Sequence, residues 1–335
     1  MNAFERYTAR LAGNPVDRPP NFDIMMAFAA HYIKQPLSKY YLDHRVLCDA
    51  NFAMVEDFQI DILQAISDPY REAHDLGAKI EFPEDGLPVS KEHLLADESK
   101  LAGLTVVAPE KGARMSDRLE AIRVFKERSG GDTPVMGWVE GALAEAADLR
   151  GVSQLMMDLI ERPEWVVELL EFCTEQAILF AKAQVAAGAD MIGLGDAVAS
   201  QVSPDMYAAY ALPYEQRIFS AVKQAGAVPR LHICGNTSWI LEHMAQSGAD
   251  IIDLDWMVDL PTAAAVFGDG PVICGNMDPV GVMLQGSPET VVMSVTECLK
   301  TGGSRCISMA GCEIPVATPH ANLHAQTRAL MAFGK

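Results

Sequence analysis

The feature that most constrains the fold is a repeated junction, in which a helical run ends in glycine and an apolar run follows. It occurs as "AAGAD" (186–190), "QSGAD" (246–250) and "KTGGS" (300–304). A glycine just past a helix adopts the left-handed conformation that ends it, so each junction predicts a helix leading into a strand. Strands that alternate with helices form a parallel sheet with right-handed crossovers.

Eight short apolar runs are the candidate strands, and they lie at 21–25, 61–66, 135–140, 190–196, 229–234, 250–255, 272–278 and 306–311. Eight strand–helix units favour a (β/α)8 TIM barrel, here with a short N-terminal helical extension over residues 2–12. An open doubly wound sheet is the alternative, but no G-x-G-x-x-G follows an early strand. The irregular region 67–134 predicts an excursion with a small hairpin. No linker or repeat divides the chain, so we expect residues 1–335 to form a single domain.

Charge and cysteine content exclude several classes of function. The formal net charge is −19, which argues against a nucleic-acid partner. No run of about 18 apolar residues is free of charge, so no membrane span is expected. The seven cysteines are odd in number and irregularly spaced, which indicates free thiols in a reducing compartment. The charged N-terminus is not typical of a signal peptide, and we expect a cytoplasmic protein.

His232 and Cys234 end the predicted fifth strand, in "RLHICGNTSW" (230–239). Residues i and i+2 point to the same side of a strand, with Cα atoms roughly 6.5 Å apart. Zinc binds nitrogen and sulfur at about 2.0–2.3 Å, so both side chains can reach one ion. Such a pair alone is more often structural than metal-binding, and a third ligand is needed to decide.

Cys312 supplies that third ligand, because it lies just past the predicted eighth strand. In a parallel barrel, functional groups gather at the C-terminal ends of the strands. Cys306 serves as a contrast, since it lies six residues earlier, roughly 20 Å back along an extended strand. His232, Cys234 and Cys312 form a soft nitrogen and sulfur ligand set that suits Zn2+, with a fourth position left open.

Asp253 and Asp255 end the sixth strand, next to this predicted site. Asp255 lies nearest the strand end and is the candidate fourth protein ligand to the zinc. The alternative is that these aspartates hydrogen-bond loop amides, or orient another ligand without touching the metal.

Polar residues also follow the third, fourth and seventh strands. Glu140, Asp196 and Asn276 are the candidate catalytic residues, expected to ring the barrel mouth. The alternative for each is a helix cap or loop anchor, and Asp278 fits a cap best. Glu140 fits a cap least, because an apolar run leads directly to it. Its carboxylate is a candidate for binding a cationic substrate or moving a proton.

Four segments carry a resemblance to a known family, namely "LAGNPVDRPP" (11–20), "SDPYREAHDLGAKIEFPEDGLP" (67–88), "GNMDPV" (275–280) and "GCEIPVATPHAN" (311–322). They resemble the uroporphyrinogen decarboxylase superfamily over about residues 5–330, which implies a (β/α)8 barrel. Its decarboxylases hold a multiply anionic tetrapyrrole with paired arginines after the first strand. Residues 21–36 here contain no arginine.

The H-x-C motif at 232–234 with a distant Cys312 is similar to the other branch, the corrinoid-dependent methyltransferases. The resemblance implies a zinc enzyme that moves a methyl group between a small methylated substrate or thiol and the cobalt of a corrinoid (methylcobalamin) carried by a partner protein. Residues 141–144 read Gly-Ala-Leu-Ala where that branch more often has Gly-Pro-x-Thr, so the substrate stays unassigned. A cofactor-free decarboxylase and a ligand-binding barrel with structural zinc remain the alternative functions. For the oligomeric state, a homodimer is the candidate.

Overall fold

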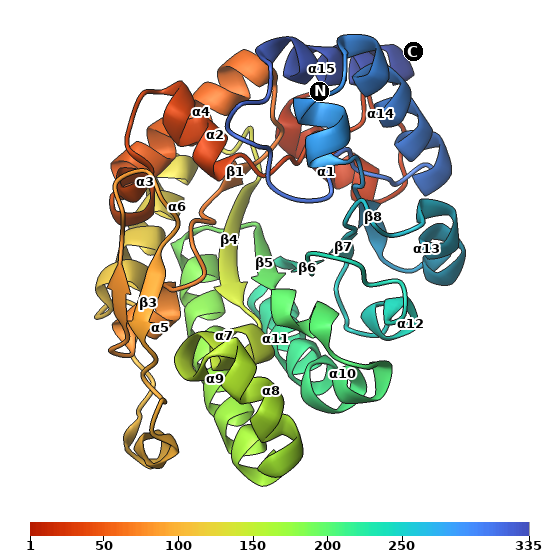
Figure 1. Ribbon diagram of the computed structural model, residues 1–335. Coiled ribbons are helices and arrows are strands. Elements are labelled where there is room, and N and C mark those ends of the chain that lie inside the picture. Colours follow the sequence, from red (N-terminus) through yellow and green to blue (C-terminus); the bar gives the residue numbers. More distant parts are fainter. Residues whose placement is uncertain (335) are drawn as a thin grey trace.

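A curled, six-stranded parallel sheet forms the centre of this α/β fold and is surrounded by helices (Figure 1). The computed structural model describes residues 1–334. The strands, in sheet order, are β1 (Leu63–Gln64), β4 (Val135–Glu140), β5 (Met191–Gly195), β6 (Val228–His232), β7 (Ile251–Asp253) and β8 (Val272–Cys274). All their residues but Val228 are buried, as expected of a parallel sheet covered on both faces.

The prediction of eight regular strands is wrong in two places, because 21–25 and 306–311 are present only as isolated parallel bridges. Asn21 pairs with Ser308, and Ile307 pairs with Cys274. Side-chain oxygens accept hydrogen bonds from backbone N–H groups that would otherwise pair with a neighbouring strand. The Asn21 amide donates to Asp61, and the Ala310 amide donates to Asp23.

The first helix is α1, the predicted N-terminal extension. Asn2 caps the N-terminus of this helix through a capping box. In full the helices are α1 (Ala3–Leu11), α2 (Met26–Tyr32), α3 (Leu37–Leu42), α4 (His44–Phe58), α5 (Arg71–Asp75), α6 (Ala113–Ser129), α7 (Ala142–Arg150), α8 (Val152–Glu161), α9 (Pro163–Ala187), α10 (Pro204–Tyr210), α11 (Leu212–Ala225), α12 (Leu241–Met244), α13 (Leu260–Phe267), α14 (Pro288–Gly302) and α15 (His320–Phe333), with the short helices η1 (Glu98–Gly103), η2 (Ala197–Gln201) and η3 (Pro279–Leu284). Gly188 ends α9 with φ +118°, as the junction "AAGAD" predicts. No helix within residues 1–334 is long and apolar enough to cross a membrane.

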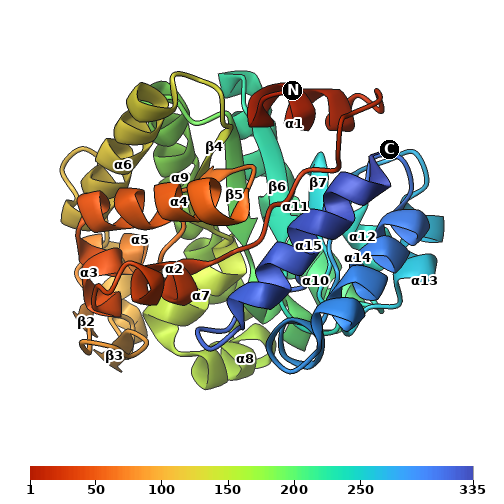
Figure 2. The same ribbon diagram turned by 90° about the horizontal axis from the view of Figure 1, so that it is seen from above.

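The two ends of the chain complete the helical layer. Helix α15 packs against α14 and reaches α4, so the last helix lies beside one of the first (Figure 2). Between β1 and β4 the chain makes the predicted excursion, whose hairpin pairs β2 (Lys79–Glu81) antiparallel with β3 (Val89–Glu92). Helix α5 opens this excursion, and its Arg71 contacts Glu140 at the carboxyl end of β4.

Candidate metal centre

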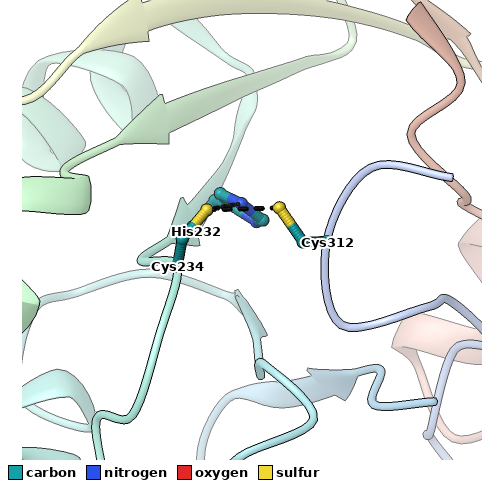
Figure 3. A group of neighbouring side chains, drawn as sticks. All are labelled: His232, Cys234 and Cys312. Carbon is teal, nitrogen blue, oxygen red and sulfur yellow. Dashed lines mark hydrogen bonds between the residues drawn. The ribbon is translucent and has the colours of Figure 1, made fainter. Parts of the chain in front are cut away.

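Three side chains meet at the carboxyl edge of the sheet, and they are the three that the sequence predicts as zinc ligands. His232 ends β6, Cys234 follows two residues later, and Cys312 approaches from the segment after the bridges within 307–310 (Figure 3). Their ligand atoms all lie within 4.8 Å of one another. Nε2 of His232 is 3.0 Å from Sγ of Cys234, which is 3.4 Å from Sγ of Cys312. Two sulfurs on one tetrahedral zinc would lie ~3.8 Å apart, so the residues present fit this ion.

A buried relay orients the histidine. Nδ1 of His232 lies 2.8 Å from Oδ2 of Asp253, and Nε of Arg230 donates to Oδ1 of the same carboxylate at 2.8 Å. Burial would raise the pKa of Asp253, but the charge of Arg230 and the His232 contact hold it below its ordinary value. The contact at Nδ1 leaves Nε2 facing the cysteines, which is the arrangement of metal-bound histidines with a carboxylate behind them.

The two cysteines differ in protonation. A hydrogen bond from the Cys234 thiol lowers the pKa of Cys312 to about 4, and the same bond raises the pKa of Cys234. Burial alone would lower the pKa of His232, but the Cys234 sulfur and the Asp253 carboxylate outweigh it and raise that pKa well above its ordinary value. Once their protons are released, a neutral imidazole and two thiolates form the soft donor set that zinc prefers.

Two other predicted positions lie outside this group. Cys306 is fully buried, and its sulfur contacts the carbonyl oxygens of Cys298 and Gly275. It lies outside the group of three ligands, as its place early in the 306–311 segment predicts. The Asp255 carboxylate accepts the amide of Gly235 at 2.8 Å and that of Met257 at 3.3 Å. Asp255 therefore occupies the loop-amide role that was the alternative to direct ligation.

A cavity of about 170 Å³ opens onto the three ligands and is mostly apolar. Its walls are formed by Ile24, Met26, Ile66, Ser67, Asp68, Pro69, Arg71, Trp138, Glu140, Gly195, Ala197, His232, Cys234, Cys312 and Glu313. Of the three predicted catalytic residues, Glu140 alone is among them. Its Oε1 accepts from Nη2 of Arg71 at 2.6 Å and from Nε1 of Trp138 at 3.1 Å. Burial raises the pKa of Glu140 to about 8, against the opposing charge of Arg71.

Asp196 and Asn276 are placed elsewhere. Asp196 is fully buried and accepts the amide of Ala144 at 2.9 Å, so it caps the neighbouring helix α7. The Asn276 side chain donates to the carbonyls of Asp255 and Val258 at 3.1 and 2.8 Å and anchors the loop after β7. A helix cap and a loop anchor are the roles that the sequence allowed for these residues in place of catalysis. Asp278 caps η3, as predicted.

Sequence reasoning missed several polar or aromatic residues of the cavity, among them Arg71, Glu313 and Trp138. Arg71 belongs to the segment 67–88, which served only for the family resemblance. It nevertheless follows the end of the predicted strand 61–66, the kind of position at which functional groups gather. Glu313 comes directly after Cys312, and its carboxylate accepts the amide of Ala27 at 2.7 Å. Burial raises the pKa of Glu313 to about 7. The ring of Trp138 lies 5.8 Å from that of His232, two residues before Glu140 on β4.

Comparison with known proteins identifies a family and two kinds of relative within it. Residues 2–333 match the family model "Uroporphyrinogen decarboxylase (URO-D)". The methylcobamide:CoM methyltransferase MtbA of Methanosarcina mazei is 36% identical over 212 residues, covering 63% of this chain and 61% of that protein. MtbA of Methanosarcina acetivorans is 34% identical over 231 residues, covering 68% and 66%. The chain thus spans less than two thirds of either relative's length.

A uroporphyrinogen decarboxylase of Nostoc punctiforme is 28% identical over 308 residues, covering 87% of this chain and 85% of that protein. Among solved structures, a methyltransferase from Methanosarcina mazei is similar with a TM-score of 0.91 and 26% identity, covering 99% of both chains. A B12-independent methionine synthase from Shewanella shares the fold, with a TM-score of 0.61 and 13% identity.

Proposed function

Because the chain belongs to the uroporphyrinogen decarboxylase family, we propose that it is a zinc-dependent, corrinoid-dependent methyltransferase. It would move a methyl group between a small methylated substrate or thiol and the cobalt of a corrinoid protein. One observation carries the proposal, which is that His232, Cys234 and Cys312 hold their ligand atoms within 4.8 Å at the wall of a cavity. The similarity to two proteins named methylcobamide:CoM methyltransferase supports it.

His232, Cys234 and Cys312 would hold the zinc and leave one position for a substrate atom. When bound, zinc favours the thiolate form of a coordinated thiol, which is the nucleophile that methyl transfer requires. The relay from Asp253 keeps the imidazole turned toward the site. Glu140, held by Arg71 and Trp138, would orient the substrate, and the apolar walls would exclude water from the reacting atoms.

The corrinoid is large and carried by another protein, so it must approach through the cavity mouth. That mouth lies at the carboxyl ends of the strands, where the loops of a (β/α)8 barrel gather. We infer that the bridges at Asn21 and within 307–310 complete such an eight-membered ring. The cytoplasmic location and the homodimer stay predictions, and the seven free cysteines favour the former.

The charges of the cavity argue against decarboxylation of a multiply anionic substrate. Arg71 is the only arginine or lysine among the described residues of its wall, and its side chain has no exposed area. Asp68, Glu140 and Glu313 line the same wall. Several substrate carboxylates would find no free cation at this wall to hold them.

The test compares Cys312→Ala with Cys306→Ala, a cysteine of the same segment whose sulfur lies away from the site. Zinc content, the thermal unfolding midpoint and methyl transfer from methylcobalamin to a thiol are measured for each. We expect about one zinc per chain in the wild type and in Cys306→Ala. Cys312→Ala should lose zinc and activity while keeping its fold. Wild-type protein without zinc would refute the proposal, and unfolding of Cys312→Ala alone would support a structural zinc.

A further inference from the structure

The chain's two exposed tryptophans lie in loops that follow neighbouring strands of the sheet. Trp239 follows β6 and Trp256 follows β7, and each is 47% exposed. Met257, beside Trp256, is exposed to the same extent, 47%. Single exposed apolar residues are common on soluble proteins, but several large ones on one rim mark a binding surface. This rim also carries the candidate metal centre, because His232 ends β6.

The loop that carries Trp256 touches both segments that hold the cysteine ligands. A glycine adjoins each of these cysteines in the sequence. Asp255 accepts the amide of Gly235, which follows Cys234, at 2.8 Å. A Cβ on Gly311 would collide with the backbone nitrogen of Trp256. The backbone of Trp256 therefore lies directly beside the metal centre.

The same loop is anchored from within the protein. The Asn276 side chain donates to the carbonyls of Asp255 and Val258 at 3.1 and 2.8 Å. These two residues flank Trp256 and Met257, so the exposed pair is presented from a stretch of backbone that is fixed at both ends. A surface that is already ordered loses little conformational entropy on binding, so this loop is suited to receive a ligand.

The cavity beside this loop is too small to enclose a corrin ring. Its volume is about 170 Å³, below the roughly 300–1,000 Å³ of pockets that enclose drug-sized ligands. A small thiol fits inside, whereas a corrin must lie across the mouth. A ring that lies over the three ligands extends onto the loops around them, and the loop of Trp256 adjoins two of the three ligand segments.

Trp256 and Met257 offer the chemistry that such a ring requires. A corrin has broad apolar faces and an edge of amide-bearing side arms. Tryptophan combines a large flat apolar surface with an N–H donor, which suits both parts of this ligand. Methionine adds a flexible thioether that adapts to an irregular apolar surface.

The rim also complements the charge of a methylcorrinoid, whose cobalt–corrin core is cationic. Residues 231–299 contain aspartates and glutamates but no lysine or arginine. This stretch includes the loops after β6, β7 and β8. Asp259 and Asp278 cap the helices that follow β7 and β8, so both carboxylates lie at the rim. A cation that approaches the loop of Trp256 therefore meets no lysine or arginine from this part of the rim.

We propose that Trp239, Trp256 and Met257 form a platform for the corrin ring of the methyl donor, with Trp256 as its central contact. This corrin platform lies outside the cavity and binds the ring itself, whichever protein carries it. Asp255 and Asn276 are positioning residues, because they hold the loop that presents Trp256. The inference rests on the proposed methyl transfer for the identity of its ligand.

The test measures the binding of two free corrinoids to zinc-loaded protein, methylcobalamin and methylcobinamide, of which the second lacks the nucleotide tail. Calorimetry without any thiol separates binding from turnover. Trp256→Ala should raise the Kd of both corrinoids at least about 10-fold, as loss of a central tryptophan does at other binding surfaces. Met257→Ala is a milder second variant and should raise both at least about threefold. Zinc content and the unfolding midpoint are recorded for every variant.

Met293→Ala is the matched control, because Met293 is an exposed methionine of α14 and not of a loop beside the metal centre. It should bind both corrinoids like the wild type. Unchanged Kd values in folded, zinc-loaded Trp256→Ala and Met257→Ala would overturn the corrin platform. A defect for methylcobalamin alone would assign the contact to the nucleotide tail and would equally count against it.

Further outcomes separate the corrin platform from the function on which it rests. Corrinoid binding that depends on Trp256, without methyl transfer to any thiol, would contradict the function and leave the platform standing. Methyl transfer from methylcobalamin with an unchanged KM for the corrinoid in Trp256→Ala would contradict the platform and leave the function standing. A wild-type homodimer that dissociates in Trp256→Ala, measured by sedimentation velocity, would assign the surface to a second copy of the chain and refute the platform.

Discussion

The carboxylate of Asp253 lies 2.8 Å from Nδ1 of His232 and turns Nε2 of that imidazole toward the sulfurs of Cys234 and Cys312. Arg230 holds the other carboxylate oxygen at 2.8 Å, and the side chains of this relay are buried. The orientation of His232 thus depends on two residues inside the sheet that are not among the three candidate ligands. Such supporting contacts commonly set both the affinity and the geometry of a metal centre.

Asp253→Asn should therefore weaken zinc binding about 10- to 100-fold. It should also lower the free energy of unfolding by about 3–5 kcal/mol, because the buried Arg230 loses its counter-charge. Competition with a chromophoric chelator measures the first effect, and denaturant titration measures the second. Asp250→Asn is the control, since its partner Lys223 is exposed and the pair should contribute at most about 1 kcal/mol. Wild-type zinc affinity in folded Asp253→Asn would show that the relay does not support the site.

Asp255→Asn separates the two roles considered for this residue. Its carboxylate accepts the amides of Gly235 and Met257, so we expect zinc content near one per chain and a loss of stability of about 1–2 kcal/mol. Metal analysis and thermal unfolding give both numbers. Loss of zinc from the folded variant would instead establish Asp255 as the fourth protein ligand.

The metal centre was the part of the molecule most open to prediction from sequence. His232 and Cys234 share one strand face by their spacing, and Cys312 follows another strand-like segment, so position along parallel strands suffices to bring them together. Glu140 could be placed in the same way, because an apolar strand leads straight into it. In each case the local backbone alone sets the direction of the side chain.

Other contacts could not be predicted, because they depend on neighbours that the sequence does not reveal. Asp196 ends a strand as expected, yet its carboxylate turns to the first turn of α7 from a different strand–helix unit. Arg71 lies in an irregular excursion, where no periodicity fixes its direction. The bridges at Asn21 and Ser308 are not full strands, because side chains such as Asp23 compete for backbone amides across the fold.

Glu215 gives the protein a testable dependence of stability on pH. Burial raises the pKa of Glu215 from 4.5 to about 7, although Tyr207 donates a hydrogen bond to it at 2.6 Å. The fold thus favours the neutral acid. Its contribution to stability is fully present below pH 4.5 and is lost as the pH rises through about 7. A shift of this size corresponds to roughly 3 kcal/mol.

Glu215→Gln removes this titration and keeps the shape of the side chain. The free energy of unfolding of the variant, relative to wild type, should therefore rise by roughly 3 kcal/mol between pH 4.5 and pH 8.5. Denaturant titrations of both proteins across this range measure the difference. The charge of Glu215 also raises the pKa of the buried Asp196, so the measured difference reports the titration of this pair of carboxyl groups. A difference that does not change with pH would mean that Glu215 is ionised in the fold throughout.

Gly195→Ala tests whether the cavity wall, and not the metal alone, sets the activity. A Cβ at Gly195 would lie 2.8 Å from Cζ2 of Trp138 and 3.2 Å from Oε2 of Glu140. Trp138 is buried and cannot withdraw, so the added methyl must displace the residue that orients the substrate. We expect kcat/KM for methyl transfer to fall about 10- to 100-fold with zinc content unchanged. Gly103→Ala is the control, because nothing lies within 4 Å of its added Cβ. Full activity in Gly195→Ala would show that the substrate binds away from Trp138 and Glu140.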